Sequence, residues 1–378
     1  MSKLSQKNLL QESENHGFKS RVKRSNSSAE GRTMRKREPR LSQRDLYFRF
    51  KKYIAENDLI GAGDKVVLAC SGGQDSISLL YLLERLAGES GLEIIVAHFN
   101  HGIRGREADS DEKFVKKNAE KLNLKFVSAK ANSRIKNEEQ ARDRRYEFLE
   151  KVRVEERAKI IAVAHNIDDL AETMLLNIIR GTGIRGLYSL RPKRGHIVRP
   201  LLFAEKNQLL SYLKEKKISY RTDSSNRRLV YTRNIIRHNI FAEITKINPV
   251  CTSAFARLSA TSAEIDDFIG QYSLEIYTKL ACKENKKIII EQKKFTTLSP
   301  AIQKEIVRKI ASDYGVDKDL TETQVSEVVA LINKNIGKKE KILGSRLKIE
   351  LRDGKIIVSK PRPVKSVSNR SAGQDLTG

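Results

Sequence analysis

The sequence predicts an α/β fold: an open, mostly parallel sheet with helices on both faces, then a helical linker and a small α+β module. Short apolar runs such as Lys65–Cys70 and Lys159–Ala164 have the unbroken hydrophobicity of strands buried on both faces. Segments with helical spacing of apolar residues separate these runs. Beyond about residue 200 the alternation gives way to mainly helical patterns.

The α/β part is predicted from alternating short and long apolar patterns. Its strands are expected over 65–70, 93–99, 125–128 and 159–164, and its helices over 46–56, 75–86, 109–122, 138–158 and 168–179. Because such strands run parallel, the polar motifs that follow them lie at the carboxyl edge of one sheet.

The second half of the chain is predicted to be mostly helical. Helices are expected over 205–217, from 232 onward, and over 251–280, 300–314 and 321–335, with a short strand over 218–220 and a hairpin of 342–350 with 355–359. The expected organisation is a disordered basic extension over 1–44, an α/β domain over 45–240, a linker over 241–284, a module over 285–360 and a disordered tail over 361–378.

The charge balance indicates a polyanionic partner. Lys and Arg outnumber Asp and Glu by 73 to 47, a formal charge of +26, of which residues 1–40 carry +7 (11 basic, 4 acidic). Self-repulsion of this size is offset when nucleic acid binds, although a basic proteome is the plain alternative. The extension itself has three readings: a disordered arm, an organellar transit peptide, or a chain that truly starts at Met34.

The three cysteines, Cys70, Cys251 and Cys282, are far apart in the sequence. This spacing disfavours a disulfide framework and a zinc or iron–sulfur site, and it favours a reducing, cytoplasmic setting. No apolar run approaches the roughly 20 residues that cross a bilayer, so no membrane association is expected.

Ser71-Gly72-Gly73-Gln74-Asp75-Ser76 follows the first buried strand. Two glycines let the backbone turn sharply, and the amides at the start of the next helix attract phosphate. An acid beside phosphate is repulsive unless it holds a cation, so Asp75 is the expected ligand of Mg²⁺. A serine-capped helix after a glycine turn is the structural alternative.

The loop resembles the pyrophosphate-binding loop of the PP-loop, or N-type, ATP pyrophosphatases. Further motifs follow it at residues 98–104, 141–146, 165–173, 180–187, 199–202, 222–226 and 233–237. In this order and spacing they resemble the tRNA(Ile)-lysidine synthetase family over about residues 46–250. One departure is Asn166, where the family often has a second histidine.

The resemblance implies an adenine nucleotide alpha hydrolase-like fold and a carbon–nitrogen ligase. Its substrates would be ATP with Mg²⁺, free L-lysine, and an isoleucine tRNA with a CAU anticodon. ATP would adenylate the C2 oxygen of the wobble cytidine, position 34, and the lysine ε-amine would displace AMP. The C-terminal module would help bind the tRNA body, and homodimers occur in the family.

The candidate site residues take their roles from this resemblance. Asp169 and Glu172, three residues apart on one helix face, would address lysine and the reacting base, with helix capping as the alternative. Arg145 is the best candidate for contacting phosphate or the adenylated base; an exposed ion pair with Glu150 or Asp143 is its alternative. The other expected tRNA or nucleotide contacts are His101, Arg104, Arg142, His165, Arg185, Arg233 and Arg237.

Three other functions remain as alternatives. A tRNA thiolase on the same loop, such as a cytidine thiolase, is disfavoured by the isolated cysteines. A small-molecule amidotransferase or synthetase is disfavoured by the charge of +26. A non-catalytic RNA-binding protein is disfavoured because the phosphate loop and the acidic pair Asp169 and Glu172 are both intact.

Overall fold

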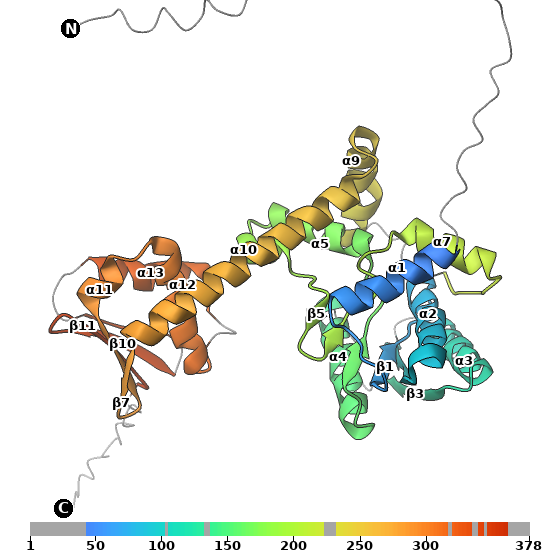
Figure 1. The fold of residues 1–378 in the computed structure, drawn as a ribbon, viewed down its shortest axis with the longest axis horizontal. Coiled ribbons are helices and arrows are strands. Elements are labelled where there is room, and N and C mark those ends of the chain that lie inside the picture. Colours follow the sequence, from blue (N-terminus) through green and yellow to red (C-terminus); the bar gives the residue numbers. More distant parts are fainter. Residues whose placement is uncertain are drawn as a thin grey trace, which may run out of the picture. The chain divides into compact units, whose positions relative to one another are not determined.

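The computed structural model describes residues 43–102, 105–131, 137–222, 232–316, 320–334, 339–343 and 346–361. Its first part contains a six-stranded sheet of order β3-β2-β1-β4-β6-β5 (Figure 1). The strands are β1 Lys65–Ala69, β2 Glu93–Asn100, β3 Lys125–Lys130, β4 Ile160–Ala162, β5 Lys193–Arg194 and β6 Ile197–Val198. Neighbours are parallel except β5 and β6, which form a short antiparallel hairpin. The predicted fold class is confirmed.

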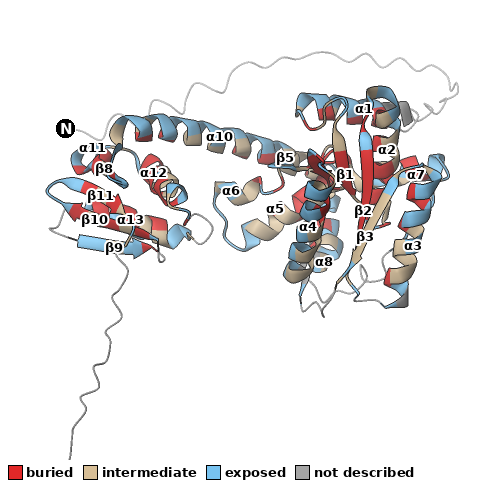
Figure 2. Ribbon diagram, turned by 90° about the horizontal axis from the view of Figure 1, so that it is seen from below, coloured by how far each residue is buried: buried red, intermediate tan, exposed pale blue. Residues whose placement is uncertain are grey.

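Helices cover both faces of this sheet because alternate residues of each strand point to opposite sides. Val66 and Leu68 of β1 pack with one group of helices, and Val67 packs on the opposite face with Leu149 and Val152 of α4. Figure 2 shows the buried central strands β1 and β2 between these layers. The helices of the first face are α1 Gln43–Glu56, α2 Gln74–Ser90, α3 Arg106–Lys121 and α7 Lys206–Glu215; the opposite face has α4 Glu138–Glu155.

The segments beyond β4 bring further helices to the carboxyl edge of the sheet. They are α5 Ile167–Ile179, α6 Ile184–Leu187, α8 Thr232–Ile235, a π-helical turn over Ile236–Ile240, and α9 Phe241–Ile247. Ala171 of α5 packs against Ile236 and Phe241 in a small core of its own. This core fixes α5 and the π-helical turn next to each other.

A second sheet, antiparallel and of order β7-β8-β11-β10-β9, lies near the C-terminal end of the described chain. Its strands are β7 Cys282–Glu284, β8 Lys287–Glu291, β9 Lys339–Leu343, β10 Leu347–Arg352 and β11 Lys355–Ser359. The accompanying helices are α10 Cys251–Leu280, α11 Gln292–Thr296, α12 Pro300–Asp313 and α13 Glu322–Asn333. One hydrophobic core joins this sheet to α12, α13 and the C-terminal half of α10. The predicted α+β character of this region is confirmed.

Two predicted strands differ from the structure. Residues 218–220 form no strand, and the nearby pairing is a single bridge between Gly73 and Arg221. The run 342–350, predicted as one strand, contains the end of β9 and most of β10, which pair antiparallel. A hairpin turned at Asp353–Gly354 is present as predicted, between β10 and β11.

Several predictions lie outside the described residues. They include most of the basic extension, the tail beyond residue 361, Arg104, and the segment 223–231. Helix α1 begins at Gln43, so the last two residues of the predicted extension are helical. Within the ranges that the structure describes, no helix combines the length and apolar character needed to cross a membrane.

Candidate active site at the carboxyl edge of the sheet

The phosphate loop leaves β1 at Cys70 and enters α2 at Gln74. Gly72 has φ of +88°, a left-handed conformation, and a Cβ there would lie 3.2 Å from a methyl group of Val115. Only glycine fits this turn without strain. The N-cap of α2 is Gly73, and no side chain caps the helix. The first amides of α2 are therefore not taken by a capping side chain, as an anion-binding helix start requires.

The hydroxyl groups of the loop are hydrogen-bonded to one another. Ser76 Oγ donates to the Gly73 carbonyl at 2.9 Å, and Ser71 Oγ lies 3.2 Å from Ser76 Oγ. Ser71 Oγ also accepts from the Gly73 amide at 3.4 Å. Ser71 is exposed whereas Ser76 is buried. Ser76 therefore shapes the loop from inside, and Ser71 is the hydroxyl that faces solvent.

Two residues that the sequence analysis did not single out support the loop. The Arg221 amide donates to the Gly72 carbonyl at 2.9 Å, and its guanidinium lies 5.1 Å from the ring centre of Phe114. Buried His98 donates through Nδ1 to the Cys70 carbonyl at 2.9 Å, and burial lowers its pKa. Both contacts are with backbone of the loop, and they fix its path between the sheet and α3.

Two acids of the α5 motif, Asp168 and Asp169, cap helices, and Asp169 also contacts the site arginine together with Glu172. Asn166 caps the helix by accepting from the Asp169 amide at 3.0 Å, and Asp169 Oδ2 accepts from the Asn166 amide at 3.2 Å. Asp168 Oδ2 accepts from the Lys206 amide at 2.8 Å, at the start of α7. Asp168 thus caps the start of α7 rather than its own helix. The Asn166 departure from the family pattern serves helix capping.

Arg237 joins the two acids of the site. Its Nε donates to Glu172 Oε1 at 2.5 Å, and its Nη2 donates to Glu172 Oε2 at 2.9 Å and to Asp169 Oδ1 at 3.2 Å. Glu172 is 4% exposed. Burial acts to lower the pKa of Arg237, but the hydrogen bonds and negative charges of Glu172 and Asp169 raise it overall. The π-helical turn, a form common at functional sites, carries this arginine.

Asp75 is electrostatically coupled to the same cluster. Burial and, next, the Asp169 carboxylate raise its pKa to about 6, while the charges of Lys206 and Arg237 oppose the shift. A carboxylate that is costly to ionise gains from a nearby cation. Mg²⁺ is commonly held by one or two carboxylates together with phosphate oxygens. Asp75 fits that pattern as a single carboxylate, and no group of three or more His, Cys, Asp or Glu ligands occurs among the described residues.

Two basic residues of α4, Arg142 and Arg145, lie beside the ring of Tyr146. The guanidinium carbons of Arg142 and Arg145 are 5.5 Å and 5.4 Å from its ring centre. Glu150, one of the alternative partners of Arg145, forms its ion pair with Arg153. The His101 ring stands at 82° to the ring of Phe99, with centres 4.9 Å apart.

His165 lies in the loop between β4 and α5 and contacts Arg199, a buried residue of the motif 199–202. Arg199 Nε donates to His165 Nδ1 at 3.2 Å. Arg199 is 2% exposed and follows β6, two positions across the sheet from the phosphate loop strand. Its position directly after the apolar pair Ile197–Val198 is the signal in the sequence that could have indicated burial. Arginine side chains are rarely buried, so this signal is weak.

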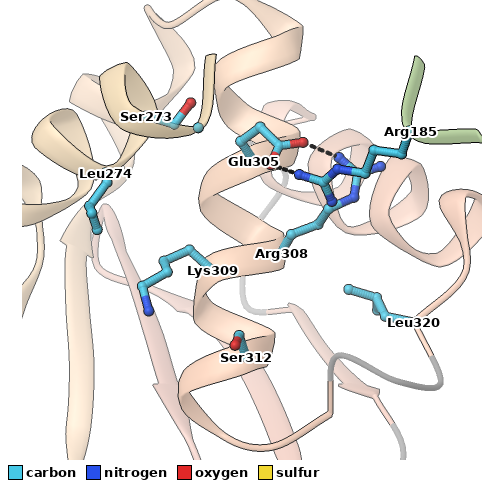
Figure 3. Close-up of a pocket in the computed structure, with 9 residues that line it drawn as sticks. Arg185, Ser273, Leu274, Glu305, Arg308, Lys309, Ser312 and Leu320 are labelled. Atoms are coloured by element: carbon cyan, nitrogen blue, oxygen red, sulfur yellow. Dashed lines mark hydrogen bonds and ion pairs between the residues drawn. The ribbon is translucent and has the colours of Figure 1, made fainter. Parts of the chain in front are cut away.

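Arg185 pairs with carboxylates of two other helices, and Figure 3 shows its pair with Glu305. Its guanidinium pairs with Asp266 of α10 at 3.3 Å and with Glu305 of α12 at 2.6 Å. Arg185 and Glu305 border a cavity of 410 Å³ that Arg308 and Lys309 also line. The structure therefore gives Arg185 a role in joining helices; its predicted tRNA contact stays a prediction, as does that of Arg233, whose side chain lies outside the description.

The cysteines form no pair in the described chain. Cys70 and Cys251 are buried and Cys282 is exposed, each as a free thiol. Burial raises the pKa of Cys70 to about 11, so its thiol stays protonated at neutral pH. A protonated thiol is a poor nucleophile.

Comparison with known proteins agrees with this geometry. The PP-loop domain family matches residues 44–244, more than half of the 378 residues. The tRNA(Ile)-lysidine synthase of Clostridium acetobutylicum is 36% identical over 279 residues, covering 70% of this chain and 60% of that protein. The protein of the same name from Thermosipho africanus is 39% identical over 232 residues, covering 59% of this chain and 54% of that protein.

Among solved structures, the U34-tRNA thiolase NcsA from Methanococcus maripaludis matches with 18% identity and a TM-score of 0.49, over 58% of this chain and 78% of that one. This chain spans 60% and 63% of the length of the lysidine synthases of Clostridium acetobutylicum and Clostridium perfringens. The matched residues 44–244 contain the phosphate loop, the acidic cluster and Arg237. The chain therefore belongs to the PP-loop domain family.

Proposed function

We propose that this protein is a ligase that joins free lysine to C2 of the wobble cytidine, position 34, in an isoleucine tRNA with a CAU anticodon. ATP is split to pyrophosphate and AMP in the process. The observation that carries the proposal is the cluster of Asp75, Asp169, Glu172 and Arg237 beside a phosphate loop without a Walker lysine. The names of the relatives support the same reaction.

In the first step the C2 oxygen of cytidine attacks the α-phosphorus of ATP. An oxygen–phosphorus bond forms and the bond to pyrophosphate breaks. The free amides at the start of α2 and the exposed Ser71 hydroxyl bind the departing pyrophosphate, because helix N-termini favour anions. Asp75 would hold Mg²⁺, which would supply positive charge beside the phosphates. Fixed charges of this kind stabilise the transition state more than mobile solvent does.

In the second step the neutral ε-amine of lysine attacks C2. A carbon–nitrogen bond forms, the bond from C2 to the adenylate oxygen breaks, and AMP leaves. The amine must first lose a proton, since only its neutral form is nucleophilic. Asp169 and Glu172 bind the lysine, and one of them accepts that proton. Lysine then competes with Arg237 for these carboxylates, since the guanidinium contacts both.

The remaining parts of the chain fit a tRNA substrate. The formal charge of +26 favours a polyanion. We propose that the C-terminal sheet and its helices bind the tRNA body. We also propose that the protein acts in the cytoplasm. The basic run of Lys339 and Lys341, interrupted by Glu340, is one candidate contact.

The decisive experiment mixes the protein with ATP, Mg²⁺, labelled lysine and tRNA. Label should enter isoleucine tRNA with a CAU anticodon and should not enter methionine tRNA, which shares that anticodon. The variant Glu172→Gln should still adenylate the tRNA but transfer less lysine. Pyrophosphate release without lysine transfer would contradict the proposal, and sulfur entering the tRNA instead would favour the thiolase alternative.

A further inference from the structure

The cavity of 410 Å³ shown in Figure 3 contains no residue of the phosphate loop or of the acidic cluster. Its volume is within the range of small-ligand sites, about 300–1,000 Å³. One face of α10 lines it around Gly270 and Ser273, and one face of α12 contributes Glu305, Arg308 and Lys309 at helical spacing. The reaction proposed above uses none of these side chains.

Ser273 is a buried lining residue whose hydroxyl makes no hydrogen bond with any residue that the structure describes. Its exposed fraction is 4%. Serines within helices commonly donate to the carbonyl four residues earlier, as Ser78 does to Gln74 at 2.8 Å. A buried hydroxyl without a partner is costly, so Ser273 indicates that a polar group binds in the cavity.

Gly270 leaves the cavity open next to Ser273. Glycine inside a helix is less favourable than alanine, so its presence in the middle of α10 calls for a reason. A Cβ at this position would meet nothing within 4 Å, so close packing does not require glycine. Because Gly270 lines the cavity, a long side chain here would fill space that a ligand could use.

The carboxylate of Glu305 is occupied by two guanidinium groups. Arg185 Nη2 donates to Glu305 Oε2 at 2.6 Å, and Arg308 Nη1 donates to Glu305 Oε1 at 2.6 Å. The dashed lines in Figure 3 mark these two contacts. Both oxygens of this acid therefore accept from cations that line the same cavity, and its negative charge is compensated there.

The lining still offers hydrogen-bond donors. Lys309 Nζ donates to Asp313 at 2.7 Å, and an ammonium group has three N–H bonds. Arg185 donates through Nε and Nη2 to Asp266 and Glu305, although a guanidinium has five N–H bonds. With the Ser273 hydroxyl, these groups suit a ligand that brings acceptor oxygens and negative charge. Phosphate has both, and it forms charge-assisted hydrogen bonds with arginine and lysine.

We propose that this cavity is a binding site for a phosphate group, which accepts hydrogen bonds from Ser273 Oγ, Lys309 Nζ and the Arg185 guanidinium. Arg308 keeps Glu305 compensated beside it. The phosphate belongs either to the backbone of a bound tRNA or to free phosphate or pyrophosphate, since all of them present the same oxygens. The site does not depend on the lysine transfer proposed above.

A tryptophan in the cavity tests the proposal, because the chain has no tryptophan of its own. Leu274 lines the cavity and is 47% exposed, so the larger ring of Leu274→Trp has room toward solvent. Without ATP, lysine or tRNA, the fluorescence of this variant should change and saturate as inorganic phosphate is added. Sodium chloride at equal ionic strength should have no such effect. A phosphate response that is absent, or that chloride reproduces, would overturn the inference.

Variants made in the Leu274→Trp protein locate the bound phosphate. Lys309→Gln should weaken phosphate binding about tenfold, because a hydrogen bond from a charged donor is lost. Gly270→Leu should abolish the response by filling the cavity. Lys279→Gln is the matched control, since Lys279 is an exposed lysine of α10 outside the lining, and it should bind phosphate unchanged. An unaltered response in Gly270→Leu would reject the site even if Lys309→Gln failed to fold.

Adding tRNA to the Leu274→Trp protein separates the two sources of phosphate. If a tRNA phosphate occupies the cavity, tRNA should change the fluorescence and compete with inorganic phosphate, and Lys309→Gln should weaken both. If free phosphate or pyrophosphate is the ligand, the phosphate response should persist unchanged with tRNA present. Each result supports a phosphate site. Neither measurement requires lysine transfer, so failure of the proposed function would be seen separately.

Discussion

At the scale of single residues, Glu172 and Arg237 form a largely buried ion pair. Glu172 is 4% exposed, and both of its oxygens accept from the one guanidinium. A buried ion pair adds little net stability, but removing one partner leaves the other charge buried and uncompensated. Removing only one residue of the pair should therefore lower the free energy of unfolding of the protein.

Arg237→Gln should lower the free energy of unfolding by about 3–5 kcal/mol at neutral pH. Arg237→Gln combined with Glu172→Gln should recover much of that loss, because the buried carboxylate that Arg237 compensated is also removed. Denaturant unfolding of the two single variants and the double variant measures the coupling. The exposed pair of Lys246 and Glu243 provides the control, since Lys246→Gln should change stability by less than about 1 kcal/mol. Equal losses in the single and double variants would refute the coupling.

Asp75 should make the protein less stable as the pH rises. Its folded-state pKa of about 6 is above the ordinary value of 3.8, so the folded state binds the proton more tightly than the unfolded state does. The penalty is absent below about pH 4 and grows as the pH rises to about 6, reaching at most about 3 kcal/mol.

Asp75→Asn should therefore stabilise the protein at pH 8 and leave it unchanged at pH 4, as measured by thermal unfolding with a chelator present. Asp58→Asn is the control, because it removes a carboxylate whose side chain is 97% exposed. Equal effects of the two substitutions at pH 8 would argue against the raised pKa. The same variant should lose activity, the usual cost of relieving strain in an active site.

The sequence predicted that Asp169 and Glu172 share one face of a helix, but it did not predict that Arg237 contacts both. Asp169 and Glu172 lie on one helix turn, so their common face follows from helix geometry. Arg237 was expected to contact tRNA or nucleotide, and its contact with Glu172 joins residues 65 positions apart. The buried position of Arg199 was not foreseen for the same reason. Contacts of this separation depend on how α5, β6 and the π-helical turn pack, which local patterns do not specify.

At the scale of elements, the turn between β1 and α2 depends on one glycine. Gly72→Ala should destabilise the protein by about 1–2 kcal/mol, since φ of +88° is unfavourable for a residue with a Cβ. The contact with Val115 adds to this cost. The substitution should also weaken ATP binding, measured by calorimetry, because the loop amides would move.

Gly88→Ala is the matched control for this prediction. Gly88 lies within the same helix α2, and a Cβ there would meet nothing within 4 Å. Alanine at this position should raise stability by about 0.5–1 kcal/mol, because it reduces the freedom of the unfolded chain. Similar losses from both substitutions would show that the turn conformation is not the cause.

Elements with long, regular patterns were predicted well, and short ones were not. The four predicted parallel strands, β1 to β4, and the helices between them follow the expected order. Strands β5 and β6 have two residues each, too few to show any periodicity, and β7 with β8 was also missed. Residues 218–220 have strand-forming side chains but lie beside only one bridge to the phosphate loop, and a strand needs a neighbouring ladder. The prediction of one strand over 342–350 did not take account of Gly344, a residue type that often marks a turn.

At the scale of the whole molecule, the excess of positive charge should dominate the salt dependence of tRNA binding. A protein that neutralises several phosphates releases their counterions, so affinity should fall by about 10³-fold between roughly 50 and 200 mM salt. Fluorescence anisotropy with labelled tRNA measures this slope. Free lysine binding, measured in parallel, should change far less, and a flat slope for tRNA would show that the charge serves another purpose.

The π-helical turn over Ile236–Ile240 also sets the rotational phase of Arg237. Each residue of an α-helix advances the side-chain direction by about 100°. A one-residue deletion within this turn could close it into ordinary α-helix and join α8 to α9 without a gap in hydrogen bonding. Either the Arg237 guanidinium would then rotate away from Glu172, or α9 would rotate about the helix axis while Arg237 stayed in place. Deleting one residue here would thus misplace the Arg237 side chain relative to Glu172, although the helix itself would become more regular.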